Sequence, residues 1–335
     1  EVTDIAGVKY NSYWGYQNGE QRNSKVKKLA EPINMLSHYW KMSDKTTLNT
    51  NVAYQTGSIG NSRLDYQGKP NPDPTYYRNL PSYYITQFDD NGVYIGNSAT
   101  NQLEASRAKF LTNRQLNWNE MYDTNRASTD GNSYYVLYAD RTDDNQLSAN
   151  SILFSDLSDN VKLNAGVNFK KLTSNNFQNL LDLLGGSYYN DIDNYGLNFG
   201  QQQSDLNNPN RKVVEGDKFG YNYKLFATTF DAFTQFKFTY KKVDFYVAQN
   251  YSRSEYQREG LYKNGYYPTN SFGKSKKVDF DNFGFKGGFT YKITGKQFFD
   301  INGYYATKAP NMRNTFPNAR VNNNVFPDLK SETIT

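Results

Sequence analysis

The chain has 335 residues, of which 16% are aromatic and 21% are charged, and it contains no cysteine. The formal net charge of +5 is small for this length and no long basic run exists, so nucleic acid is not expected as a partner. No stretch approaches the ~18 consecutive apolar residues that a transmembrane helix needs. The 30 tyrosines and 22 phenylalanines instead lie among Asn, Thr, Lys and Gly, which is typical of a sheet with one wet and one apolar face.

Alternation of apolar and polar residues with a period of two predicts β-strands along most of the chain. The first, about residues 25–41, alternates poorly and should be irregular at Pro32. The clearest lies at 161–172, where Val161, Val167 and Phe169 share one side. Further strands are expected at 45–56, 147–157, 219–240, 243–256, 278–292 and about 299–305. With a last strand in which the chain ends, about nine are predicted, and both ends look like cuts within a longer protein.

The connections between these strands alternate between short and long. Tight turns are expected at Ser43-Asp44, Asp159-Asn160, Lys241-Lys242 and Thr294-Gly295. Long connections are expected at residues 58–145, 174–216, 258–276 and 309–328. This rhythm favours an all-β, antiparallel up-and-down transmembrane barrel with long extracellular loops over a Greek-key sandwich. A soluble carbohydrate-binding sandwich remains as a third hypothesis.

Three local features carry their own predictions. The apolar parity switches within 219–240, which favours one long strand with a bulge near Thr228-Thr229 over a turn near Asp231. A helix is expected from Thr100, as N-cap, to Tyr122. A second helix is expected at 176–184, ended by Gly185-Gly186.

Several stretches resemble TonB-dependent receptors of the Bacteroidetes type, which carry a carboxypeptidase-like regulatory domain. Residues 244–260 look like their barrel strand after a short turn, and residues 14–19 and 116–122 also look like stretches of that group. The segment from Ala309-Pro310 to Glu332 resembles their "AP … NP-x-LKPE" pattern, but has Phe326 where Asn is usual and Ser331 where Pro is usual. The resemblance covers most of the chain.

The resemblance implies a 22-stranded barrel with an internal plug, of which residues 1–335 are a portion of the barrel domain. The plug, the N-terminal domains and the TonB-contacting segment are not expected in these residues. The implied partners are the lipid bilayer of the outer membrane, the plug domain of the same protein, the TonB–ExbB–ExbD complex and a surface lipoprotein lid. The implied location is the cell outer membrane.

Catalysis is not predicted, because His38 is the only histidine and is interpreted as a residue of an interfacial aromatic belt. The acidic pairs Asp89-Asp90 and Asp143-Asp144 are expected in polar loops. Residues Asp191, Asp193 and Asn194 faintly resemble the start of a calcium loop, but Gln202 stands where its closing Glu belongs. No cofactor or metal is therefore predicted, with this trio as the weak Ca²⁺ candidate.

Aromatic residues outside the spans are the candidate ligand contacts, because their rings can stack on sugars or peptides and donate hydrogen bonds. Packing between loops is the simpler interpretation of each one. The candidates are Tyr13, Trp14, Tyr16, Tyr76, Tyr77, Tyr83, Tyr84, Tyr188, Tyr189, Tyr266 and Tyr267.

Two functions are compatible with a barrel of this kind. The first is energised import of a large nutrient, such as a glycan, peptide or siderophore, captured by the extracellular loops. The alternative is a surface structural or adhesive barrel, or a barrel component of a protein secretion machine.

Overall fold

One large antiparallel sheet forms the body of the computed structural model, which describes residues 1–85, 91, 93 and 96–335. Its hydrogen-bonded order is β15-β14-β13-β11-β10-β7-β6-β5-β3, with β4 beside β5 and β12 beside β11. The strands are β3 (Lys27–Ala30), β4 (Ile33–Ser43), β5 (Thr46–Tyr66), β6 (Tyr135–Ser158), β7 (Val161–Asp182), β10 (Lys218–Thr239), β11 (Val243–Gly260), β12 (Gly273–Lys274), β13 (Val278–Lys292), β14 (Phe298–Lys308) and β15 (Glu332–Ile334). The predicted all-β, antiparallel up-and-down topology is confirmed.

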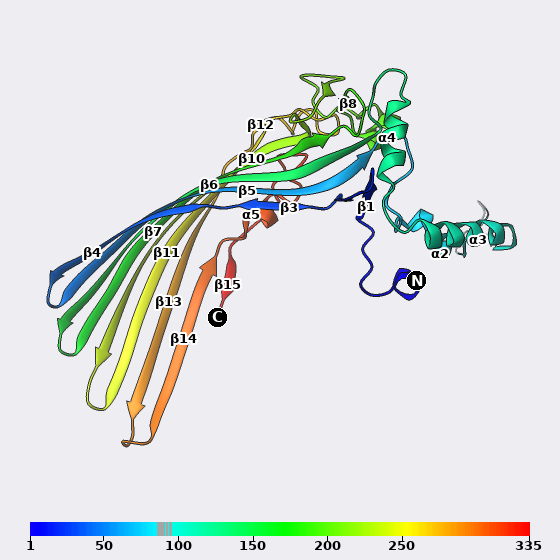
Figure 1. Ribbon diagram of the computed structural model, residues 1–335. Helices are drawn as coiled ribbons and strands as arrows, with labels where there is room; N and C mark the ends of the chain where they lie inside the picture. The colour runs from blue at the N-terminus through cyan, green and yellow to red at the C-terminus, as the bar shows by residue number, and fades with distance from the viewer. Residues whose placement is uncertain (86–90, 92, 94–95) are drawn as a thin grey trace.

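The sheet runs from tight turns at one end to folded loops at the other (Figure 1). All four predicted tight turns are present, and the first strand breaks at Glu31-Pro32, between β3 and β4. Smaller elements lie in the segments before and between the long strands: α1 (Val2–Ala6), β1 (Trp14–Gln17), β2 (Glu20–Asn23), η1 (Tyr77–Asn79), α2 (Pro81–Ile85), α3 (Gly96–Thr112), α4 (Trp118–Arg126), β8 (Tyr189–Asn190), η2 (Asn194–Phe199), β9 (Lys212–Val213) and α5 (Met312–Thr315). Within the described residues, no helix has the length and apolar character to span a membrane.

The long strands extend well past their predicted ends. The 24 residues of β6 make it roughly 80 Å long at ~3.3 Å per residue. Residues 55–66 and 135–146, most of which are predicted to lie in a loop, pair with each other without a shift. The prediction that Asp143-Asp144 lies in a loop is therefore wrong, since both residues are within β6. The pair Asp89-Asp90 lies outside the described residues.

Both helix predictions need correction. Residues 176–182 belong to β7, where Asn176 pairs with Thr142 and Tyr223 on the two sides. Backbone pairing on both edges therefore overrides the helical spacing there. The expected helix at 100–122 is two helices, α3 and α4, and Thr100 lies inside α3 rather than at its N-cap. The cap that the structure does contain is Asn117, whose Oδ1 accepts from the Glu120 amide at 3.1 Å.

Strand β10 is a single strand, as predicted, but the bulge is elsewhere. Thr228 and Thr229 pair regularly with β7 and β11, and Asp231 continues both ladders, so the turn alternative is also wrong. The register shift lies between Phe219 and Asn222, where Gly220 has φ 64°. The parity switch has another cause: Tyr223 and Leu225, near the loops, lie on one face of the sheet, whereas Phe236 and Phe238, near the tight turn, lie on the other face.

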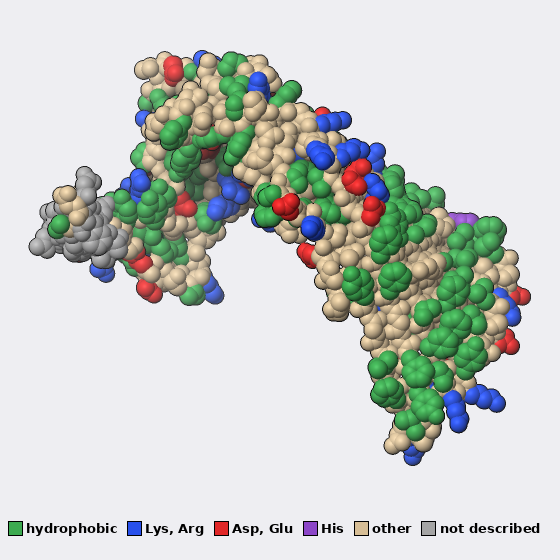
Figure 2. All heavy atoms as spheres, turned by 180° about the vertical axis from the view of Figure 1, so that it is seen from behind, with side chains coloured by type: hydrophobic (Ala, Val, Ile, Leu, Met, Phe, Trp, Pro, Cys, Tyr) green, Lys and Arg blue, Asp and Glu red, His purple; other side chains and the backbone are tan. Residues whose placement is uncertain are grey.

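The register gathers apolar residues from eight strands on one side of the lower sheet. Val167, for example, lies between Ser151 and Ala232, and Phe285 between Gln249 and Tyr305. Figure 2 shows hydrophobic side chains gathered over this part of the sheet. We call this surface the apolar face; its larger members are Leu36, Trp40, Leu48, Val52, Leu153, Leu163, Val167, Phe169, Phe236, Phe238, Phe245, Val247, Phe283, Phe285, Phe289, Phe299, Ile301 and Tyr305.

The opposite face of the lower sheet is mostly polar. Asn51 donates to Asn150 at 2.9 Å, and Asn168 donates to Asp231 at 2.5 Å. The apolar face is not covered by another sheet in the part of the chain that the structure describes, and Val167 and Phe285 are 45% and 54% exposed. The two hydrophobic clusters instead lie at the loop end of the sheet.

The apolar face forms a band near the tight turns. Above this band, toward the loops, the same side of the sheet carries charged side chains. Arg253 forms ion pairs of 2.9 Å and 3.2 Å with Asp279 and Asp281, and Lys277 pairs with Glu255 at 2.7 Å. Charged side chains also gather across the middle of the view in Figure 2. The strands therefore carry an apolar band near the tight turns and a charged band above it.

Candidate ligand-binding site in the loops

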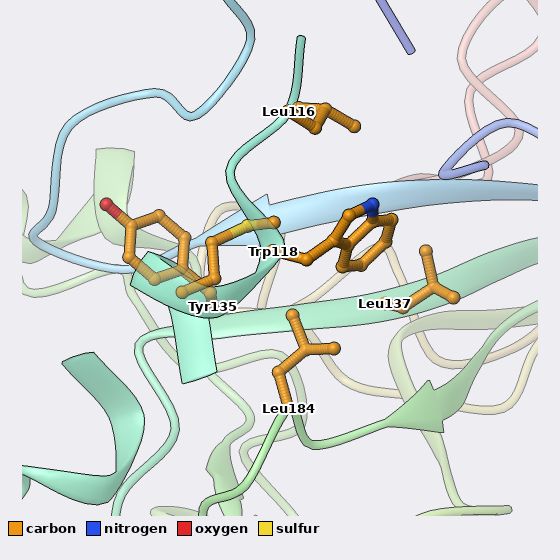
Figure 3. Packing of buried hydrophobic residues seen from close by; sticks show 6 residues of the cluster. Leu116, Trp118, Tyr135, Leu137 and Leu184 are labelled. Carbon is orange, nitrogen blue, oxygen red and sulfur yellow. The ribbon is translucent and has the colours of Figure 1, made fainter. Parts of the chain in front are cut away.

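The loop end is held together by a cluster around Trp118. Trp118 is fully buried among Leu116, Tyr135, Leu137 and Leu184 (Figure 3). Its Nε1 donates to the Arg22 carbonyl at 3.1 Å, which ties α4 to β2. The helix α4, the β1–β2 hairpin and the ends of β6 and β7 meet at this cluster and therefore pack as one unit. We call the folded loops at this end of the sheet the cap.

Asn125 on α4 is the polar centre of this cap. Its Nδ2 donates to the carbonyls of Tyr135 (2.7 Å), Leu183 (2.9 Å) and Leu184 (3.1 Å). Its Oδ1 accepts from the amides of Tyr134 (2.8 Å) and Tyr135 (3.0 Å). One buried amide thus satisfies backbone groups from two chain segments that leave the sheet.

A second cluster places Tyr189 against the upper sheet. Its ring lies edge-on to Phe219, with 5.6 Å between centroids, and Tyr138 meets the same ring at 5.6 Å. The Tyr189 Oη donates to the Asp65 carboxylate at 2.9 Å. Burial raises the pKa of both the Tyr189 phenol and the Asp65 carboxyl. The contact therefore joins β8 to β5 through a hydrogen bond that is shielded from water.

A cavity of about 570 Å³ lies beside this contact. It is at the loop end of the sheet, on the side opposite the apolar face. We call it the chamber. This volume is within the ~300–1,000 Å³ typical of small-molecule sites. The chamber is lined by the upper ends of β5, β10 and β11 and by the loops around residues 189–204, 262–266 and 320–321; its aromatic and charged lining residues are Asp65, Tyr66, Lys69, Tyr189, Asp193, Tyr195, Phe219, Tyr221, Arg258, Tyr262, Tyr266 and Arg320.

Two arginines that line the chamber lie over neighbouring tyrosine rings. Arg258 is 2% exposed, and its Cζ lies 5.3 Å from the Tyr223 ring centroid. The Arg320 Cζ lies 4.3 Å from the centroid of Tyr221, and the two tyrosine rings are 5.9 Å apart. Burial lowers the pKa of the Arg258 guanidinium to about 10, and it raises the pKa of Tyr221 and Tyr223. The site thus combines arginine side chains and aromatic surfaces with the carboxylates of Asp65 and Asp193.

The structure separates the predicted aromatic residues into different places. Tyr189 and Tyr266 line the chamber, whereas Tyr13 lines a smaller hollow of about 170 Å³ with Lys25 over its ring. Tyr76, Tyr77, Tyr83 and Tyr84 form a chain of edge-on ring contacts with centroids 4.8–5.5 Å apart. Trp14 packs edge-on to Tyr16. Tyr188 lies beneath Lys212, and Tyr267 is exposed.

The calcium candidates do not converge. Asp191 is buried, and its carboxylate binds the Arg211 guanidinium and accepts from the Gly220 amide at 2.7 Å. The Asp193 carboxylate accepts from the Tyr195 amide at 2.9 Å, at the start of η2. The side-chain Nδ2 of Asn194 donates to the Tyr66 carbonyl at 3.4 Å. Within the described ranges, no group of three or more His, Cys, Asp or Glu residues could hold a metal ion.

His38 is an exposed residue of the apolar face, and its ring centroid is 6.4 Å from that of Trp40. This position fits the predicted aromatic environment. Several lining residues of the chamber were not predicted, among them Tyr66, Tyr221, Arg258 and Arg320. The local sequence around Arg258 and Arg320 does not distinguish them from other surface arginines.

Replacing Tyr189 with Phe should destabilise the cap by about 1–3 kcal/mol at pH 7, because the Asp65 carboxylate then loses a buried donor. Burial raises the folded-state pKa of Asp65, so the penalty for ionising this residue appears as the pH rises above its unfolded pKa of about 3.9. The effect of the substitution should therefore shrink at pH values below about 3.9, where the carboxyl is protonated in both states.

Urea midpoints of the cap at low and neutral pH, followed by hydrogen exchange, measure this effect. Tyr188→Phe is the matched control, because its Oη donates to Asp130 at 3.1 Å in an exposed position. An equal change in the two variants would contradict the role given to Tyr189.

Comparisons with known proteins provide little further constraint. No protein-family model matches the chain, and no curated protein matches its sequence. Among solved structures, the chain is similar to the ferric-catecholate import receptor Fiu from E. coli K12. Its open form has a TM-score of 0.42 at 12% identity, over 86% of this chain and 37% of that one. Its closed form has a TM-score of 0.43 at 12% identity, over 86% and 34%. The chain thus spans about a third of the length of these structures, and the assignment of its fold depends on the strand pairing.

Proposed function

We propose that the chain forms part of the wall and loop cap of an outer-membrane receptor barrel of the TonB-dependent type, which captures a nutrient for energised import. One observation carries this proposal. The register of eight strands joins exposed apolar side chains into one face, while the opposite face is polar and leads up to the chamber. A barrel with lipid outside and water inside has this division of faces.

The dimensions of the apolar band support a membrane location. On β7 the band extends from Val161 to Phe169, about 9 residues, which is the length of a tilted transmembrane strand. On β11 and β13 the charged pairs around Arg253 follow directly after Tyr251 and Phe283, where these strands would leave the hydrocarbon. The upper strand halves and the cap would then extend outside the cell.

The edges of the sheet support a larger barrel. Within the described residues, β4 pairs only with β5, and residues 298–305 of β14 pair only with β13. Unpaired strand edges are unfavourable in a bilayer, so further strands would close the wall. We propose that the polar face surrounds a plug domain of the same protein, that TonB–ExbB–ExbD supplies energy, and that a surface lipoprotein can cover the loops.

Spin labels test the membrane assignment directly: residues 1–335 contain no cysteine, and any cysteine elsewhere in the full-length protein is replaced by serine. Single cysteines at Val167 and Phe285, labelled in the full-length protein in vesicles, should be accessible to oxygen but not to a water-soluble nickel chelate. Labels at the neighbouring residues Asn168 and Lys286, on the opposite face, should show a lower oxygen accessibility. Strong nickel accessibility at Val167 and Phe285 would place them in water and contradict the proposal.

Deletion of the gene separates import from the alternative functions. Cells that lack the receptor should lose uptake of one nutrient class, tested with oligosaccharides, peptides and siderophore-bound iron as sole sources. Their surface and secreted proteins should remain unchanged. Loss of surface export with normal uptake would instead favour a barrel of a secretion machine.

A further inference from the structure

We propose that the chamber binds a ligand that carries a carboxylate, and that this group is held by Arg258 and Arg320, which lie over the rings of Tyr223 and Tyr221. The inference rests on the proposed function, since it assigns a ligand chemistry to the same loop site. It depends on how the two guanidinium groups are placed and on which partners they have.

Arg258 is a buried cation that is held in place by neutral groups. Its Nε donates to the Ala319 carbonyl at 2.5 Å, and its Nη1 donates to the Ser271 carbonyl at 3.0 Å and to Asn323 Oδ1 at 2.6 Å. Among the described residues, no carboxylate forms an ion pair with it. A buried charge without a counter-ion is unfavourable, and a bound anion would offset this.

Arg258 also keeps part of its donor capacity. Its three hydrogen bonds use Nε and Nη1, and none of them uses Nη2. This nitrogen is not fully buried, and Arg258 lines the chamber. The fixed Nε and Nη1 therefore orient a guanidinium that still has donors for a ligand.

Arg320 provides the second cation. It lies next in sequence to Ala319, which accepts from Arg258, so the same loop holds both groups. Its nearest carboxylate is Asp140 at 4.0 Å, which already pairs with Arg63 Nε at 3.0 Å and accepts from Tyr221 Oη at 2.8 Å. One carboxylate therefore serves two arginines, and the positive charge of Arg320 is only partly balanced.

The remaining wall favours an organic carboxylate. Guanidinium groups bind planar carboxylates through paired hydrogen bonds, and tyrosine rings offer flat surfaces to a sugar ring or side chain. Tyr66, Tyr262 and Tyr266 add such surfaces around the chamber. An acidic sugar and an acidic peptide both supply this carboxylate, and the experiment distinguishes these sources.

The test uses two probe pairs, each an acid and its neutral derivative. Trigalacturonate is compared with its fully methyl-esterified form, and N-acetyl-Gly-Tyr-Glu with its fully amidated form, by titration calorimetry on the purified full-length protein. We expect the acid of one pair to bind about tenfold more tightly than its neutral partner, or more, and the preference to weaken with salt.

Three variants locate the effect. Arg320→Gln should remove most of the preference for the acid; its side chain is 55% exposed and its ion pair is long, so folding should be little affected. Arg258→Lys keeps the charge but loses the planar guanidinium that can form two parallel hydrogen bonds to a carboxylate, so it should also reduce the preference for the acid. Arg253→Gln, on the other face of the sheet, is the matched control and should bind as the wild type does.

Several results would overturn the inference. These are equal binding of acid and neutral probes, no binding of any probe up to about 10 mM, a preference that survives in both Arg320→Gln and Arg258→Lys, or one that Arg253→Gln also removes. The spin-label experiment is independent of these outcomes. A barrel that is shown to lie in lipid but has no preference for acids would lose only this inference, whereas acid binding by a protein outside the membrane would remove only the proposed function.

Discussion

Arginine in place of Val167 is expected to destabilise the folded protein in lipid vesicles by about 2–4 kcal/mol, whereas arginine in place of Asn168 should change its stability by less than about 1 kcal/mol. The two residues are neighbours on β7 and lie on opposite faces of the sheet. Val167 is 45% exposed, and its cross-strand neighbours Ser151 and Ala232 offer no counter-charge. A guanidinium there would lie in hydrocarbon, within the apolar band that extends from Val161 to Phe169 on β7.

The control substitution has a favourable environment. Asn168 already donates to the Asp231 carboxylate, so an arginine at 168 would gain an opposite charge on the wet side of the wall. Urea unfolding of the full-length protein in vesicles, followed by the gel shift between folded and unfolded barrel, measures both variants. A penalty of the same size for the two variants, or none for Val167→Arg, would show that the apolar face does not contact lipid.

The wall was predictable because its signal is local. Each strand of the lower sheet repeats with a period of two, so a short window such as residues 161–172 reveals which side chains share a face. The sequence does not reveal whether the apolar sides of neighbouring strands align. That alignment comes from the register, for example from Phe236 facing Val247 and Phe238 facing Phe245, which the tight turn between β10 and β11 imposes.

The upper halves of the strands could not be predicted from the sequence, and the reason is physical. Most of residues 56–63 and 140–146 are polar on both faces, whereas Tyr135 to Ala139 are apolar on both, because the two buried clusters cover both sides of the sheet there. Such a stretch has no simple alternation and therefore resembles a loop. The expected helix at 176–184 fails similarly, since Phe177 and Leu180 pack at the upper end of β7.

The chamber was predictable only in part. Tyr189 and Tyr266 were among the candidates because loop tyrosines often contact ligands, but the same criterion also selected Tyr76 and Tyr77, which pack on each other. The arginines of the chamber come from β11 and from the segment after β14. Their proximity is a property of loops that fold over the sheet, and no spacing within either segment encodes it.

Replacing Asn125 with Asp should release the cap from the wall, at a loss of about 3–5 kcal/mol at neutral pH. The Asn125 amide nitrogen donates to three carbonyls, and an ionised carboxylate would place an oxygen against all three. Asn119→Asp is the matched control, since this residue is exposed on the same helix and changes by the same atom.

Hydrogen exchange at Tyr134 and Tyr135, whose amides donate to Asn125 Oδ1, should quicken in Asn125→Asp and stay slow in Asn119→Asp. Trypsin should also cut after Arg126, at the end of α4, while the barrel keeps its folded mobility on gels. The wall should survive because the ladders of β5, β6 and β7 continue without a shift from Tyr138 down to Asp156. If the barrel unfolded together with the cap, the two would form one cooperative unit, and the separation between a wall held by strand pairing and a cap held by one buried amide would be wrong.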